Sequence, residues 1–121
     1  MARPREFDEY VVVTQVASLF AKQGFNGTSL DDLVTTTGLQ RGSIYKAFGS
    51  KLNLFHLALQ QTAADFSGSQ SDLDLLTVAL KELSTEDEIT SKICRQVLDS
   101  SDLDLPLLLG SNLINKAKGV G

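Results

Sequence analysis

The sequence predicts an all-α fold, on three observations. Apolar residues recur every three to four positions over long stretches, which is the spacing of one face of an α-helix. Runs that alternate apolar and polar residues, as strands do, are few. Only 2 prolines interrupt the 121 residues, and 42% of the residues are hydrophobic, which is enough for a packed core. At this length we expect one domain, or one small domain followed by part of a second.

The first helix is expected over residues 7–23, where the apolar residues form one stripe: Val12, Val13, Val16, Leu19 and Phe20. Gly24 is placed to end this helix, because glycine readily adopts the conformation that follows a last helical turn. The second helix is expected from about residue 30 to 37. Thr28 and Ser29 both qualify as its N-cap, since each has an aspartate three residues later.

The third helix is expected from about residue 40 to 48, after a turn that starts at Gly38. Ile44 and Phe48 lie four residues apart and share one face, which we expect to pack on the core. A fourth helix follows over residues 50–66. Two short helices joined by a tight turn, the second with small and cationic residues on one side, are typical of a helix-turn-helix that enters a DNA groove.

Three more helices are expected after a linker at residues 68–71. A capping box of Thr85 and Glu88 is expected to open the sixth, and Pro106 suits the first turn of the seventh. The run from residue 105 to 114 is interpreted as core in preference to the wall of a ligand cavity. The residues expected to face inward in these helices are Leu73, Leu76, Leu80 and Leu83, then Ile89, Ile93 and Val97, then Leu109, Leu113 and Ile114.

The formal net charge of −4 argues against a nucleic-acid partner, but the charges are not spread evenly along the chain. Residues 1–66 hold six Lys or Arg and six Asp or Glu, whereas residues 67–121 hold five against nine. Residues 41–51 contain three cations and no acid. Because DNA affinity depends on the local patch that meets the phosphates, the acidic total does not exclude DNA binding, although a solvated face explains the same charges.

Several classes of protein are not expected. No apolar stretch approaches the roughly 20 residues of a membrane-spanning helix, and acidic residues follow Arg5 where a signal peptide would be apolar. We therefore expect a cytoplasmic protein with no membrane partner. The single cysteine, Cys94, allows no internal disulfide and no cysteine metal cluster, and we interpret it as a small buried hydrophobe in preference to a reactive thiol.

Enzyme chemistry is also not expected. His56, the single histidine, lies among apolar residues of the fourth helix and is interpreted as a packed or surface side chain. The sequence has no Gly-rich phosphate loop, no zinc-ligand spacing and no set of residues resembling a catalytic triad. We expect no cofactor and no metal.

Small and hydrogen-bonding residues open the third helix: Gln40, Arg41, Gly42 and Ser43. Arg41 can form two hydrogen bonds to a guanine edge, and Gln40 two to an adenine. Gly42 costs about 1 kcal/mol relative to alanine inside a helix. Its presence fits either the close approach of a neighbour or a loose helix start.

Three more residues are candidates for phosphate contacts. Tyr45 and Lys46 lie on the outer flank of the third helix, although Tyr45 also fits a half-buried core position. Lys51 stands in the first turn of the fourth helix, where the positive helix end disfavours a cation. A bound phosphate would offset that repulsion and use the free N–H groups of the turn.

Residues 7–66 resemble the N-terminal domain of the TetR family of bacterial transcriptional regulators. The resemblance depends on several segments together: Leu19-Phe20, Gly24-Phe25, Thr28-Ser29-Leu30, Gly38-Leu39, Gly42-Ser43-Ile44-Tyr45-Lys46-Ala47-Phe48, and Ser50-Lys51 with Leu54. It implies that Thr28, Tyr45, Lys46 and Lys51 hold the DNA backbone, that Gln40, Arg41, Gly42 and Ser43 face base edges, and that Arg3 and Arg5 form an arm toward the minor groove. Two departures weaken helix caps: Gln40 replaces a common serine, and Asn53 a common glutamate.

The resemblance also implies a division of the chain. Residues 1–48 would form a helix-turn-helix DNA-binding domain, residues 50–66 a connecting helix, and residues 67–121 a partial ligand-binding and dimerisation domain. Family members run to about 200 residues, and residues 110–117 faintly resemble a mid-domain helix of theirs, so the chain is either a truncated product or a short variant.

The function implied is that of a transcriptional regulator, by expectation a repressor. It would bind a palindromic double-stranded DNA operator as a homodimer, and a small-molecule inducer would release it. The alternative is a helical protein-interaction module, or a truncated regulator that does not bind DNA.

Overall fold

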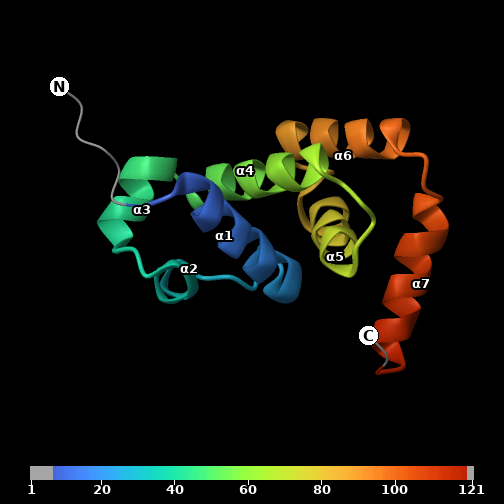
Figure 1. Cartoon of the computed structure of the whole chain (residues 1–121), viewed down its shortest axis with the longest axis horizontal. Helices are drawn as coiled ribbons and strands as arrows, with labels where there is room; N and C mark the ends of the chain where they lie inside the picture. The colour runs from blue at the N-terminus through green and yellow to red at the C-terminus, as the bar shows by residue number, and fades with distance from the viewer. Residues whose placement is uncertain (1–6, 120–121) are drawn as a thin grey trace.

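The computed structural model describes residues 7–119, and within them the chain is all-helical, as the sequence predicts. The helices are α1 (Glu9–Gln23), α2 (Leu30–Thr37), α3 (Arg41–Phe48), α4 (Lys51–Ala64), α5 (Gln70–Val78), the π-helical turn η1 (Ala79–Leu83), α6 (Glu88–Ser100) and α7 (Leu105–Ala117). Figure 1 shows α2 and α3 at one end of the molecule, α1 and α4 crossing its middle, and α7 at the opposite end. No helix in the described part is long and apolar enough to cross a membrane.

The first two helices begin and end at residues suited to those positions. Asp8 caps α1 by accepting hydrogen bonds from two backbone N–H groups of its first turn. Gly24 ends α1 with a φ of 83°, which a residue with a Cβ rarely adopts. Of the two candidate caps for α2, Ser29 is the cap: its hydroxyl accepts from the Asp32 N–H, and the Asp32 carboxylate accepts from the Ser29 N–H.

The turn between α3 and α4 is closed by Asn53. Its side-chain amide donates to the Phe48 carbonyl at 2.8 Å, while its backbone N–H donates to the capping hydroxyl of Ser50 at 3.0 Å. Asn53 therefore lies in the first turn of α4 and also provides a hydrogen-bond donor for a carbonyl at the end of α3. Gln40, at the start of α3, makes no side-chain capping bond, as expected from the missing serine.

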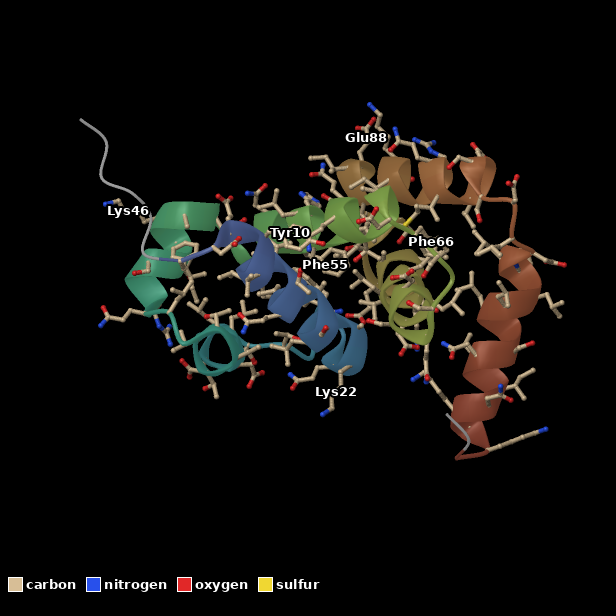
Figure 2. All side chains as sticks on the ribbon, viewed as in Figure 1. Tyr10, Lys22, Lys46, Phe55, Phe66 and Glu88 are labelled. Atoms are coloured by element: carbon tan, nitrogen blue, oxygen red, sulfur yellow. The ribbon has the colours of Figure 1, made fainter. Side chains whose placement is uncertain are left out.

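An aromatic cluster joins α1, the loop after it and α4. The ring centroids of Phe20 and Phe55 lie 5.1 Å apart, and those of Phe25 and Phe55 lie 5.4 Å apart, both pairs with edges directed at faces. Phe20 and Phe55 are fully buried. Figure 2 shows Phe55 inside the molecule. The cluster fixes the angle at which α4 leaves the first three helices.

The second half packs on the first through α5 and α6. Helix α5 lies against α1, α6 lies against α4, and α7 lies against α5. The leucine stripe expected to form one fifth helix is interrupted: the Ser84 N–H donates to the Ala79 carbonyl, five residues back, at 2.9 Å. Leu80 and Leu83, which were expected to face inward, are partly buried there and pack on the core.

The start of α6 differs from the prediction. Its N-cap is Asp87, which accepts from the Thr90 N–H, so the capping box expected of Thr85 and Glu88 does not form. Ile89, expected inward, is 50% exposed, because the buried face of α6 is the i, i+3, i+4, i+7 set that begins at Thr90. Cys94, Ile93 and Val97 are buried, as predicted.

Helix α7 also differs from the prediction. Leu105 is buried and Leu109 is partly buried, but Leu113 and Ile114 are 51% and 57% exposed instead of forming core. The physical reason is that α7 packs on α5 along the side that carries Leu105, Leu109 and Asn112, whose amide donates to the Asp74 carboxylate at 2.7 Å. Leu113 and Ile114 lie beside that side and face outward within the described part.

Candidate nucleic-acid interface

Helix α3 has two chemically different faces. Ile44 and Phe48 are each 2% exposed and pack in the core. The residues exposed on the other side are Gln40, Arg41, Gly42, Ser43, Tyr45 and Lys46. We call this set the α3 outer face. Two buried anchors behind a polar surface leave the helix free to lie against a large, flat or grooved partner.

The anchors are supported from two directions. Phe48 packs near the ring of Phe7, with 6.1 Å between centroids. Gly38, with a φ of 73°, ends α2 in the left-handed conformation, and its N–H donates to the Val34 carbonyl. The glycine turn therefore sets the direction in which α3 begins, and the two phenylalanines hold its far end.

Gly42 has open space where a side chain would be. A Cβ built at this position meets no atom within 4 Å. Packing within the described part of the protein therefore does not require glycine here. This fits the interpretation in which the absent side chain lets an external partner approach the helix backbone.

Tyr45 and Lys46 extend the outer face toward the end of α3. Tyr45 is 52% exposed, which fits both the outer-flank position and the half-buried position expected for its ring. Lys46 stands in the last turn of α3, where the negative helix end favours a cation. Figure 2 shows Lys46 at the outer end of the molecule, pointing away from the body.

Arg41 is not free on this face. Its guanidinium forms an ion pair with the Asp31 carboxylate, which lies in the first turn of α2. Both side chains remain open to solvent, with 58% of Arg41 and 81% of Asp31 exposed. The base-contacting residue expected from the sequence therefore has an acidic partner inside the protein.

Lys51 also has partners within the protein. Its ammonium donates to the Thr28 carbonyl at 2.9 Å and lies 4.2 Å from the centroid of the Phe25 ring. These contacts tie the start of α4 to the loop before α2. The repulsion expected between this cation and the helix end is offset by a backbone carbonyl and an aromatic face, so Lys51 already has a structural role before any phosphate binds.

Thr28 lies apart from the other expected contact residues. Its side chain is buried, at 1% exposure, and its hydroxyl donates to the Gly24 carbonyl at 2.6 Å. Since Ser29 caps α2, the threonine turns inward and closes the loop. A phosphate contact from the Thr28 hydroxyl, implied by the family resemblance, is not available in this arrangement. Arg3 and Arg5, the expected arm, lie outside the described residues.

His56 and Asp87 join α4 to α6, a contact that the sequence did not predict. The His56 Nε2 lies 2.6 Å from an Asp87 carboxylate oxygen, and His56 is buried at 7% exposure. The Thr90 hydroxyl and N–H also donate to this carboxylate. The pKa of Asp87 is lowered, first by the Thr90 hydroxyl and further by His56, against an opposing effect of burial.

The histidine thus has a packing partner, as expected, and one carboxylate does not make a metal site. Within residues 7–119 no group of three or more His, Cys, Asp or Glu side chains could hold a metal ion. The signal that could have located Asp87 is its own capping chemistry, since Asp is a favoured N-cap three residues before Thr90.

Comparison with known proteins shows what the segment that contains this geometry is similar to. Residues 15–58, which include α2, α3 and the turn between them, match the model described as "Bacterial regulatory proteins, tetR family". Over these residues the chain is similar to TetR-family regulators, a class of regulatory proteins.

Three curated relatives resemble the N-terminal half of this chain. The uncharacterized HTH-type transcriptional regulator YezE of Bacillus subtilis is 38% identical over 60 residues, which are 50% of this chain and 31% of that protein. The HTH-type transcriptional repressors ComR and BdcR of Escherichia coli are 36% and 34% identical over 59 residues each, covering 49% of this chain and 28% and 30% of those proteins. The matched part is thus about a third of each relative's length.

A solved structure extends the likeness in fold to nearly the whole chain. It is a cysteine mutant of the TetR family transcriptional regulator CifR complexed with 26-bp double-strand operator DNA. The match has a TM-score of 0.65 and covers 97% of this chain and 91% of that one, at 18% sequence identity. At this identity the likeness concerns the fold alone, and it includes the helices after α4.

Proposed function

We propose that this protein is a transcriptional regulator that binds double-stranded DNA through the α3 outer face. The observation that carries the proposal is the arrangement of α3: Ile44 and Phe48 hold it from behind, while Arg41, Gly42 and Tyr45 face outward. The surface lies within the residues that match the TetR family, and the fold neighbour is complexed with operator DNA. A short polar helix held in this way can lie in a major groove.

The exposed residues divide into two groups by chemistry. Gln40, Arg41 and Ser43 have the donors and acceptors that meet base edges, and Gly42 leaves space for them to approach. Tyr45 and Lys46, further along the helix, would contact phosphates and fix the orientation of the protein. Lys51 would support the loop before α2 and reach a phosphate only by sharing its donors with the Thr28 carbonyl.

The finer parts of the proposal concern assembly and regulation. A homodimer would place two α3 helices in successive major grooves of a palindromic operator, about 34–36 Å apart. Repression is supported by the names of two relatives. An inducer acting on a regulatory part formed by residues 67–121 would move the DNA-binding part, residues 1–48, through α4.

A protein-interaction module is the second candidate, because one observation favours it. Leu107, Leu113 and Ile114 of α7 are 63%, 51% and 57% exposed. Apolar side chains gathered on one helix are typical of a surface that binds protein. This surface lies at the opposite end of the molecule from α3, so the two functions are compatible and separable (Figure 1).

The test is binding to a fluorescent duplex of random sequence, measured by anisotropy at a series of salt concentrations. A DNA-binding protein loses affinity with a slope of about 0.9 log units per log unit of salt for each phosphate contact. We expect a slope that corresponds to several phosphate contacts. Absence of binding at low salt would refute DNA binding and leave the interaction module.

A further inference from the structure

The ion pair between Asp31 and Arg41 gives the outer face of α3 an internal competitor. Arg41 is the first residue of α3, and its guanidinium meets the carboxylate of Asp31 on α2. A guanidinium binds carboxylate and phosphate with the same planar donor geometry. Whatever holds Arg41 on Asp31 therefore competes with DNA phosphate for the same donors.

The positions of the two residues stabilise this pairing. Asp31 lies in the first turn of α2, where the positive helix end favours an anion. Arg41 lies in the first turn of α3, where the helix end disfavours a cation, and the carboxylate offsets that repulsion. Asp31 makes no N-capping bond of its own, because Ser29 and Asp32 cap α2. Its charge is thus available to Arg41.

The ion pair of Asp31 with Arg41 is expected to be weak. Asp31 is 81% exposed and Arg41 58% exposed, and exposed ion pairs contribute little to stability. A guanine edge offers Arg41 two aligned acceptors, and we expect it to displace Asp31 from the pair. A single phosphate in a loose complex offers no such alignment, and we expect the pair to remain closed against it.

We propose that Asp31 is a positioning residue that keeps Arg41 away from the phosphates of non-specific DNA. In the free protein the Asp31 carboxylate occupies the donors of Arg41 that could bind a phosphate. When the protein binds a random duplex, Arg41 remains paired with Asp31. The inference rests on the proposed DNA binding through α3 and adds to it a residue of α2 that lowers affinity for unselected sequences.

The experiment is a double-mutant cycle on a random duplex with the variants Asp31→Asn, Arg41→Ala and both together. Asp31→Asn is expected to tighten binding about 3- to 10-fold and to steepen the salt slope by about 0.9, because Arg41 gains one phosphate contact. In the Arg41→Ala background the same change is expected to alter affinity less than about 2-fold and leave the slope unchanged.

Two results would overturn the inference. One is an unchanged salt slope in Asp31→Asn. The other is an equal gain in the Arg41→Ala background, which would make Asp31 a general repulsive charge. If the unaltered protein binds no duplex at any salt concentration, the proposed function itself fails, and that result is distinct from either of these.

A second measurement needs no DNA. Hydrogen exchange at the Arg41 side chain, followed by NMR in the free protein, is expected to speed up at least about 2-fold in Asp31→Asn, because the guanidinium N–H groups lose a charged acceptor. Equal exchange in both proteins would show that the pair does not hold Arg41 in solution. Because Asp31 is 81% exposed, the substitution disturbs no packing.

Discussion

The Glu82 carboxylate accepts a hydrogen bond of 2.8 Å from the backbone N–H of Asn26, 56 residues earlier in the chain. Glu82 lies on the π-helical turn η1, and Asn26 lies in the loop that leads into α2. Lys51 binds the same loop from α4, through the Thr28 carbonyl. The loop before the helix-turn-helix is therefore held from the second half of the chain as well as from the first.

This relationship gives the first prediction. Glu82→Ala should speed hydrogen exchange at the Asn26 amide and lower the free energy of unfolding by about 1 kcal/mol, because a hydrogen bond to a charged group is lost. NMR exchange and urea denaturation measure the two effects. Lys81→Ala, an exposed neighbour on the same turn, is the control. Unchanged exchange at Asn26 would show that Glu82 does not hold the loop.

The contact between His56 and Asp87 gives the second prediction. Asp87 caps α6 and also bonds a buried histidine, so Asp87→Ala should lower the free energy of unfolding by about 2 kcal/mol. Asp87→Asn keeps a capping side chain and should lose less. Urea denaturation at pH 7 compares them. Equal losses would mean that the cap contributes nothing.

The lowered pKa of Asp87 predicts a pH dependence. A carboxyl group whose pKa is lower in the folded state than in the unfolded state stabilises the fold fully when the pH is above the unfolded-state pKa. This stabilisation is lost as the pH falls through the folded-state pKa. The ordinary value is 3.8, so this contribution should decline below about pH 4. Denaturation of Asp87→Asn from pH 6 to pH 3 should show a flatter loss of stability than the unaltered protein. Parallel curves would contradict the assignment.

Cys94 should be chemically inert in the folded protein. Burial raises the pKa of its thiol to about 11, so the reactive thiolate is scarce at pH 8. A thiol-specific reagent at pH 8 should react with Cys94 at least about a hundredfold more slowly in buffer than in denaturing urea. Similar rates would show that α6 opens readily.

The two faces of α3 should respond differently to substitution. Phe48→Ala removes a buried ring and should lower the free energy of unfolding by about 3–5 kcal/mol, whereas Lys46→Ala should change it by less than about 0.5 kcal/mol. For duplex binding, Lys46→Ala should reduce the salt slope by about 0.9, the contribution of one phosphate contact. Lys22→Ala, which removes a cation of α1 on a different part of the molecule, is the control and should leave the slope unchanged (Figure 2). Equal effects of Lys46 and Lys22 would indicate attraction by total charge alone.

The elements that the sequence predicted well are those set by short-range patterns. The spacing of Ile44 and Phe48 was enough to assign the inner and outer faces of α3, and glycines at 24 and 38 located the ends of α1 and α2. The N-cap of α2 was harder to predict, because Thr28 and Ser29 both qualified from the sequence. Only the packed structure shows which hydroxyl turns inward to the Gly24 carbonyl.

The contacts that the sequence did not predict join residues far apart in the chain. The pairs of Asp31 with Arg41, His56 with Asp87, and Asn26 with Glu82 are separated by 10, 31 and 56 residues, and no local pattern links their members. Periodicity likewise marked Leu113 and Ile114 as apolar positions on one helix but did not show whether another element covers them. In the described part they are exposed.

The most direct test of the central claim is an NMR titration of the labelled protein with a short random duplex at low salt. If the α3 outer face is the contact surface, the amide signals of residues 40–46 should shift most, and those of residues 107–114 in α7 should remain in place. Shifts centred on α7, or spread evenly over the molecule, would contradict it.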